Sequence, residues 1–136
     1  MAGLTHLLDN SVHAHLDHEA VSQRFFELQV PRRIARGAMF DLEALFSARR
    51  PRDVHKALLD AMPLVPTHQA DFDRAVEVML ALADAGRHRS VKTPDLIVAA
   101  VAERAGLIVL HYDRDFDAIA AVTGQAVEAV VPMGSL

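Results

Sequence analysis

Cysteine and tryptophan are absent from the 136 residues, and tyrosine occurs once. Without cysteine the chain cannot form disulfides, zinc-thiolate sites or a thiol nucleophile. No stretch approaches the ~20 uninterrupted apolar residues of a membrane span. The N-terminus also lacks the basic start and long apolar run of a secretion signal. From the sequence we therefore expect a cytoplasmic protein that is not attached to a membrane.

Lysine is scarce, because 12 of the 14 basic residues are arginine, and the formal net charge is −4. Arginine suits phosphate groups better than lysine does, although a GC-rich genome would give the same bias. The basic residues gather in two places, which we call the 49–52 cluster (Arg49, Arg50, Arg52) and the 87–92 cluster (Arg87, His88, Arg89, Lys92). Each can present basic surface to a nucleic acid, or be a solvated or dimer-facing surface.

Hydrophobic residues make up 51% of the sequence and charged residues 24%, which excludes a globally disordered chain. At this length we expect one domain covering residues 1–136. Strands are expected near residues 4–8, 33–37, 62–65, 107–110 and 127–131, and helices near 12–28, 38–48, 51–59, 68–85, 96–105 and 113–122. Alternating strands and helices predict an α/β fold with a mostly parallel central sheet flanked by helices on both faces.

Acidic residues follow two of the expected strands. Asp9 follows the first strand, and Asp113 and Asp115 follow the strand before the last helix. Ligands of open α/β sheets bind beyond the carboxyl ends of the strands, so these positions are functional candidates. Asp95 lies in the first turn of the most apolar helix. Glu43 projects from a largely apolar helical face, where a carboxylate is costly to bury without a positive partner.

Taken alone, each acid also has a structural interpretation. These interpretations are helix caps for Asp9 and Asp115, a helix-dipole contact for Asp95, a turn position for Asp113, and an ion pair with Arg36 or Arg49 for Glu43. Together, four or five carboxylates at one sheet edge would repel one another without a cation. Oxygen ligands without cysteine favour Mg²⁺ or Mn²⁺ over zinc. Such ions assist displacement at phosphorus, so the acids predict phosphodiester hydrolysis.

Four segments resemble the four motifs of PIN-domain ribonucleases, in order and over nearly the whole chain. They are LLDNSV (residues 7–12), DLE (41–43), PDLIVAA (94–100) and HYDRDF (111–116). More closely, they are similar to VapC toxins of bacterial toxin-antitoxin modules, particularly a type common in mycobacteria. Each motif alone is weak, but the ordered set is fairly specific.

The resemblance implies a three-layer α/β/α fold and a Mg²⁺- or Mn²⁺-dependent endoribonuclease. The implied substrate is structured RNA such as tRNA or rRNA, whose cleavage inhibits translation. It further implies a homodimer and inhibition by a cognate VapB-type antitoxin. Under this hypothesis, Arg49, Arg50 and Arg52, together with Arg89 and Lys92, steer the RNA backbone.

Carried over residue by residue, the resemblance gives an acidic quartet of Asp9, Glu43, Asp95 and Asp113. In this hypothesis Asp9 and Asp95 hold the metal ion, and Glu43 and Asp113 position it and the attacking water. Ser11 matches a small hydroxyl residue near the metal in the family. The fourth acid stays open between Asp113 and Asp115, because both fit the motif, and we favour Asp113.

Competing functions make different demands on the sequence. A phospho-receiver domain needs a late lysine in the sheet, but the last lysine is Lys92, before the final two expected strands. Asp-nucleophile phosphatases need a second acid where this chain has Ser11. The remaining alternative is a catalytically silent PIN-fold module that binds an antitoxin or RNA. Metal-dependent RNA cleavage separates that module from the nuclease, whereas antitoxin binding does not.

Overall fold

Short strands with mostly buried side chains form the central sheet. In the computed structural model, which describes residues 3–136, the strands are β1 (His6–Leu8), β2 (Ile34–Ala35), β3 (Ile108–His111) and β4 (Val127–Ala129). They are all parallel, in the order β2-β1-β3-β4. Strands of parallel sheets are buried on both faces, and this explains the uninterrupted aliphatic residues in β1 and β3.

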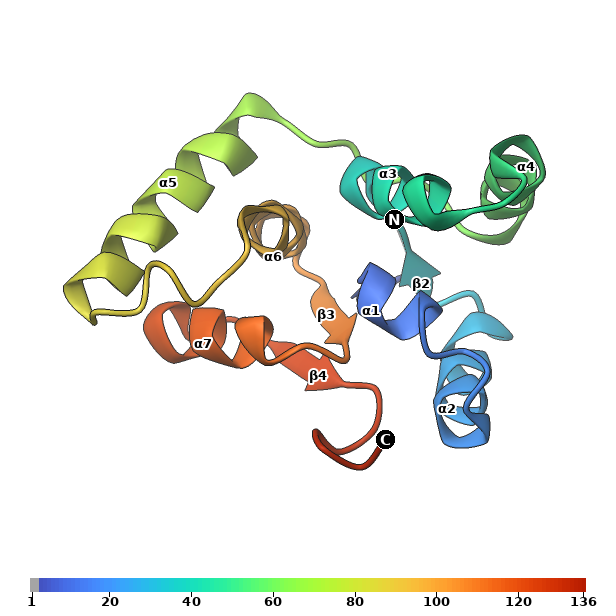
Figure 1. Ribbon diagram of the computed structural model, residues 1–136. Coiled ribbons are helices and arrows are strands. Elements are labelled where there is room, and N and C mark those ends of the chain that lie inside the picture. The colour runs from blue at the N-terminus through green and yellow to red at the C-terminus, as the bar shows by residue number, and fades with distance from the viewer. Residues whose placement is uncertain (1–2) are drawn as a thin grey trace.

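Helices cover both faces of this sheet (Figure 1). They are α1 (Asn10–His13), α2 (Glu19–Gln29), α3 (Ala38–Ser47), α4 (Pro51–Ala61), α5 (Gln69–Asp84), α6 (Thr93–Ala105) and α7 (Arg114–Thr123). Among residues 3–136, no helix has the length and apolar character needed to cross a membrane.

The strand register divides the core into two clusters. Leu7 pairs with Val109, and both belong to the cluster formed with α5, α6 and α7. Leu8 pairs with Leu110, and both belong to the cluster formed with α1, α2, α3 and α4. Because successive side chains of a strand point to opposite faces, one register fills both layers. The predicted three-layer α/β/α sandwich is confirmed.

The single helix expected at 12–28 is two helices in the structure. α1 ends at His13, and a run of backbone bonds between residues three apart leads through His15 and Leu16 to His18, before α2 begins. Val12 of α1 and Val21 and Phe25 of α2 nevertheless pack on one core cluster.

The strand expected at 62–65 is reduced to one isolated bridge between Arg36 and Leu64. Two backbone bonds make this bridge, from Arg36 N to Pro63 O and from Val65 N to Arg36 O. Pro63 has no N–H group to donate toward β2, so the pairing cannot extend backward, and α3 begins two residues after Arg36 and ends it on the other side. The sheet of the described residues therefore has four strands with a one-bridge extension beside β2.

The helix expected at 68–85 is confirmed as α5, but its large apolar side chains do not all face the core. Phe72, Val76 and Leu80, spaced four residues apart, are exposed. Ala75 and Leu82 are among the residues that pack against the rest of the protein. Both stripes have helical spacing, so periodicity alone does not tell which one is buried.

Candidate active site

The acids singled out in the sequence gather at the carboxyl ends of β1 and β3. Asp9 follows β1 directly, and its backbone N–H donates to Leu110 O at 3.0 Å. Asp113 lies two residues beyond the end of β3 and caps α7. Because β1 and β3 are adjacent and parallel, their ends bring these two residues to the same edge.

Asp9 both caps a helix and leaves one oxygen free. Its Oδ2 accepts from the backbone N–H of Ser11 at 3.0 Å and from the Ser11 hydroxyl at 2.5 Å. Its Oδ1 is buried and has no hydrogen-bond partner among the described residues. Burial raises the pKa of Asp9, while the bonds from Ser11 work in the opposite direction. The capping interpretation is thus correct for Oδ2 but does not explain the buried, unpartnered Oδ1.

Ser11 joins the two strand ends. Its hydroxyl donates to Asp9 and accepts from the backbone N–H of Tyr112 at 2.8 Å. A hydroxyl can do both at once, since it has one donor and two lone pairs. Ser11 therefore fixes the orientation of Asp9 relative to the segment that carries Asp113.

Among the acids of the site, Asp95 has the most strongly shifted pKa. It is 3% exposed, in the first turn of α6, and its Oδ2 has no hydrogen-bond partner in residues 3–136. Burial first, then contact with the Asp115 carboxyl and the charge of Asp9, raise the pKa of Asp95 to about 8. Its two neighbours at the edge, Asp113 and Asp115, each offer a carboxylate oxygen, and one oxygen from each of the three acids lies within 4.8 Å of the others.

Glu43 approaches from α3 on the opposite side of the site. Its Oε1 is buried without a hydrogen-bond partner among residues 3–136. Burial, followed by the charge of Asp9, raises the pKa of Glu43. Arg36, one of its expected partners, instead makes an ion pair with Asp41. Asp41 is therefore a half-buried structural acid.

Lys92 is the one basic side chain that contacts these acids within the described part of the chain. Its Nζ lies 2.9 Å from Asp113 Oδ2, 2.7 Å from Asp115 Oδ2 and 3.4 Å from Asp95 Oδ2. The sequence indicated Lys92 only as an RNA contact. The available signal was its spacing, because a lysine three residues before a first-turn aspartate can reach that carboxylate.

Three carboxylates therefore contact a single ammonium group, and the charges of Asp9 and Glu43 add to the cluster. Asp9 Oδ1, Glu43 Oε1 and Asp95 Oδ2 are buried oxygens without hydrogen-bond partners in residues 3–136. Hard divalent cations such as Mg²⁺ and Mn²⁺ bind sets of oxygen ligands of this kind. The residues present thus fit a divalent metal ion.

Two histidines near the site have structural positions. His111 is fully buried, its ring lies 5.0 Å from that of Phe116, and its Nδ1 accepts from the backbone N–H of Asp113. Burial lowers the pKa of His111. His15 packs edge-on against Tyr112, with 5.2 Å between ring centroids. In both rings Nδ1 is engaged, by the backbone N–H of Asp113 in His111 and by the Ser11 carbonyl in His15.

The surface around the acids is basic on two sides and apolar on a third. Arg49 and Arg50, between α3 and α4, are exposed, as is Arg89 before α6. A depression of about 270 Å³ beside Glu43 is lined by Asn10, Leu42, Glu43, Phe46 and Ser47. Phe46 is 94% exposed.

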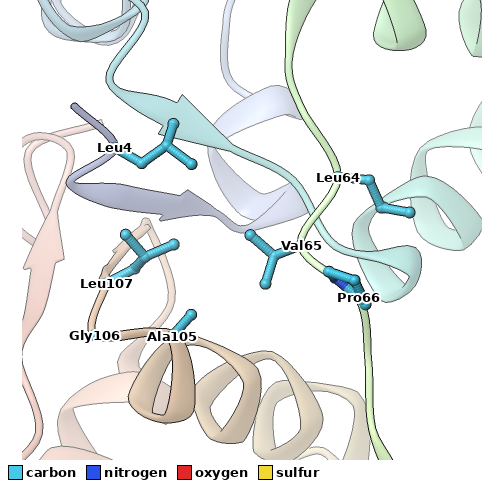
Figure 2. A pocket seen from close by; sticks show the side chains of 7 residues that line it. All are labelled: Leu4, Leu64, Val65, Pro66, Ala105, Gly106 and Leu107. Carbon is cyan, nitrogen blue, oxygen red and sulfur yellow. The ribbon is translucent and has the colours of Figure 1, made fainter. Parts of the chain in front are cut away.

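A larger cavity lies at the other edge of the sheet (Figure 2). It has a volume of about 390 Å³ and is lined by Leu4, Leu64, Val65, Pro66, Ala105, Gly106 and Leu107. Leu4 and Leu107 precede β1 and β3, so this cavity is at their amino ends. None of its lining residues is titratable, and it has no part in the chemistry of the acids.

Comparison with known proteins gives a consistent result. The family described as "PIN domain" matches residues 12–122, a range that includes Glu43, Asp95, Asp113 and Asp115 and begins three residues after Asp9. The chain is 46% identical over 134 residues to the ribonuclease VapC21 of Mycobacterium tuberculosis, with 96% of each chain covered. It is 40% identical over 135 residues to the ribonuclease VapC51 of the same organism, with 98% of each covered.

Solved structures of other proteins have a similar fold. The chain in a DNA-bound VapBC structure from Salmonella typhimurium has a TM-score of 0.75 at 17% identity, covering 94% of this chain and 99% of that one. A chain of VapBC-5 from Mycobacterium tuberculosis has a TM-score of 0.60 at 30% identity, covering 91% and 95%.

Proposed function

The chain belongs to the VapC group of the PIN-domain family, and from this premise we propose that it is a Mg²⁺- or Mn²⁺-dependent endoribonuclease, the toxin of a toxin-antitoxin module. One observation carries the proposal. Asp95, Asp113 and Asp115 come within 4.8 Å of one another, the charge of Asp9 acts on both Asp95 and Glu43, and Asp9, Glu43 and Asp95 each keep a buried oxygen without a hydrogen-bond partner in residues 3–136. Most buried oxygens of native proteins are paired, and the three unpaired ones here belong to acids whose pKa is raised by burial.

In the proposed reaction each acid has its own role. Asp9 and Asp95 hold the metal through their unpartnered oxygens. Glu43 and Asp113 orient the attacking water from opposite sides of the site. A bound divalent ion supplies positive charge to the scissile phosphate and makes water a better nucleophile. Ser11 keeps Asp9 in the orientation that presents Oδ1 to the site.

For the fourth acid we propose Asp113 rather than Asp115. Asp115 Oδ2 accepts from both the backbone N–H and the ammonium of Lys92, at 2.9 and 2.7 Å. Asp113 uses Oδ1 to cap α7, and its Oδ2 receives only the ammonium. Asp115 thus holds Lys92 through two hydrogen bonds. Asp113 Oδ2 has only one, so it can turn toward a metal-bound water more easily.

The proposed substrate is structured RNA such as tRNA or rRNA, whose cleavage stops translation. Because this RNA is cytoplasmic, we propose that the protein acts in the cytoplasm. The support is the name of its relatives, which are ribonucleases, and the exposed arginines beside the acids. Arg49, Arg50 and Arg89 can each neutralise a phosphate, so binding should weaken as salt concentration rises.

We propose a VapB-type antitoxin as the protein partner. The structural relatives include VapBC assemblies. An amphipathic helix fits an apolar groove through residues three and four positions apart. The exposed side chains of Leu42 and Phe46 border the depression beside Glu43, so an antitoxin helix bound there would also cover the acids.

We also propose a homodimer, and assign its contact to the outward face of α5. Phe72, Val76 and Leu80 form a continuous apolar stripe there, beside a hollow that reaches Ile97 of α6. Exposed apolar patches of this kind mark interaction sites in soluble proteins.

The first test is cleavage of total RNA by purified protein freed of antitoxin, with Mg²⁺, with Mn²⁺ and with EDTA. Cleavage should require the metal and should disappear in Asp9→Asn, which keeps the α1 cap because asparagine caps helices as well as aspartate does. Asp17→Asn, at an exposed acid outside the cluster, is the matched control and should cleave like the parent. Metal-independent cleavage, or full activity of folded Asp9→Asn, would contradict the proposal. A folded protein that binds antitoxin but cleaves no RNA would favour the catalytically silent module.

A further inference from the structure

Lys92 occupies the centre of the acidic site. Its ammonium lies 2.7 to 3.4 Å from oxygens of three carboxylates, those of Asp95, Asp113 and Asp115. The side chain is 63% exposed, whereas that of Asp95 is 5% exposed. The ammonium therefore closes the open side of the site, between the buried acids and solvent.

The oxygens that Lys92 touches are those that the metal would need. Asp95 Oδ2, the atom nearest to its ammonium on that residue, is also one of the three buried oxygens without a hydrogen-bond partner. Asp113 Oδ2, at 2.9 Å, belongs to the acid proposed above to orient water. A divalent ion that binds these two oxygens, at Mg²⁺–oxygen distances of about 2.1 Å, would compete with the ammonium for the same negative charge and would repel it.

Asp115 provides a place for Lys92 that the metal does not need. Its Oδ2 accepts from the backbone N–H of Lys92 as well as from the ammonium, so it holds the residue at both ends. The backbone bond keeps the start of α6 fixed when the ammonium moves. Lys92 can thus withdraw from Asp95 and Asp113 without a change in the helix.

We propose that Lys92 is a built-in competitor for the divalent metal ion, which occupies the metal's oxygens on Asp95 and Asp113 and must be displaced from them when the metal binds. The inference rests on the metal site of the proposed function. Lys92 is a positioning residue: it neutralises part of the acidic cluster when metal is scarce, and it weakens metal binding. Once displaced, its ammonium stays tethered at the rim, facing solvent.

Mn²⁺ binding tests this without RNA, by electron paramagnetic resonance of the free ion and by calorimetry on the full-length protein. Lys92→Met keeps the length of the side chain and removes the charge, and it should bind Mn²⁺ on the order of tenfold more tightly than the parent. Lys92→Arg keeps the charge and should bind no more tightly than the parent. Arg89→Met is the matched control, because Arg89 is an exposed neighbour without an ion pair among the described residues.

Thermal unfolding gives a second readout. In EDTA, Lys92→Met should unfold at a temperature roughly 3 °C lower than the parent, because its carboxylates have lost their counter-ion. Saturating Mn²⁺ should remove this difference. A purely structural lysine would lower the unfolding temperature equally with and without Mn²⁺.

Unchanged or weaker Mn²⁺ binding by Lys92→Met would overturn the inference and leave the proposed nuclease standing. Equal tightening by Arg89→Met would also overturn it, because the effect would then come from overall charge rather than from contact with the acids. A parent protein that binds no Mn²⁺ would overturn both this inference and the metal dependence of the proposed function.

Discussion

Two buried aspartates occupy equivalent places on neighbouring helices and behave in opposite ways. Asp71 is in the first turn of α5 and is 1% exposed, and Asp95 is in the first turn of α6 and is 3% exposed. Burial alone would raise the pKa of Asp71, but Arg104 and the backbone N–H of His68 outweigh it and the pKa is lowered. For Asp95, burial and then the neighbouring carboxyls of Asp115 and Asp9 raise the pKa to about 8.

Asp95 is the more strongly desolvated of the two, and the partners of the two acids also differ. Asp71 accepts from Nε and Nη2 of Arg104 at 2.8 and 3.1 Å and from His68 N at 2.8 Å. Asp95 has a buried oxygen with no hydrogen bond in residues 3–136 and an ammonium at 3.4 Å. A buried carboxylate with all its partners stabilises a fold, whereas one without them costs stability unless a ligand completes it.

The largest expected effect is on cleavage by Asp95→Asn. The variant loses a proposed metal ligand and should have no detectable nuclease activity, while its fold remains intact because an uncompensated buried charge has been removed. Asp71→Asn should keep its activity per folded molecule. Gel assays of RNA cleavage, corrected for the folded fraction by circular dichroism, test the contrast. Loss of activity in both variants at equal folded fraction would erase the distinction between these two acids.

Stability should show the opposite ranking. Asp71→Asn leaves Arg104 without its counter-ion, and removing one partner of a buried charge-assisted pair costs about 2 kcal/mol. Asp95→Asn should change the free energy of unfolding little, or increase it, in metal-free buffer. Urea unfolding at pH 7 in EDTA measures both variants. Greater destabilisation by Asp95→Asn would show that Asp95 has partners in the metal-free protein.

The pH dependence of stability should also differ in sign. The pKa of Asp95 is raised above its unfolded value of 3.8, so between pH 4 and pH 8 the folded protein binds a proton that the unfolded chain does not. Stability from this group is present at low pH and is lost as the pH rises toward 8. At about 1.4 kcal/mol per pH unit, the parent in EDTA should lose roughly 3–4 kcal/mol between pH 5 and pH 8 relative to Asp95→Asn.

Asp71 has the reverse dependence, because its pKa is lowered below the unfolded value of 3.8. Its contribution is present above that value and is lost as the pH falls through the folded pKa. Urea unfolding across the pH series, with the two asparagine variants side by side, separates these contributions. Equal slopes for parent and Asp95→Asn in EDTA between pH 5 and pH 8 would contradict the raised pKa of Asp95.

Topology explains why the position of the acids could be predicted from the sequence. Asp9 and Asp113 follow two aliphatic runs, and parallel strands that neighbour each other must end at one edge. The three-layer fold follows from the same alternation of strands and helices. For Glu43 the indication from the sequence was weaker. Its neighbours on α3 are apolar, and a carboxylate on an apolar face is costly to bury unless it binds a cation.

Other features depend on how the folded chain packs, which sequence spacing alone does not encode. The pair of Arg36 with Asp41 forms because β2 and α3 bring the two side chains together, so Asp41 could not be told from a surface acid. The break between α1 and α2 has no proline or glycine to mark it. In α5 the stripe that contains Phe72 and the stripe that contains Ala75 have equal periodicity, and only packing decides which is buried.

A third carboxylate, Glu128 on β4, gives the smallest expected effect and completes the comparison. It accepts from Nε and Nη2 of Arg24 and lies 3.0 Å from His6 Nε2. Burial would raise its pKa, but Arg24 and then His6 lower it. Its side chain is 31% exposed, so Glu128→Gln should cost only about 0.5 kcal/mol. Because Glu128 already has its partners, the variant should leave Mn²⁺ affinity and RNA cleavage unchanged. A clear loss of either would mean that the site depends on charges well beyond the acids at its edge, and that pairing does not separate structural from functional carboxylates in this protein.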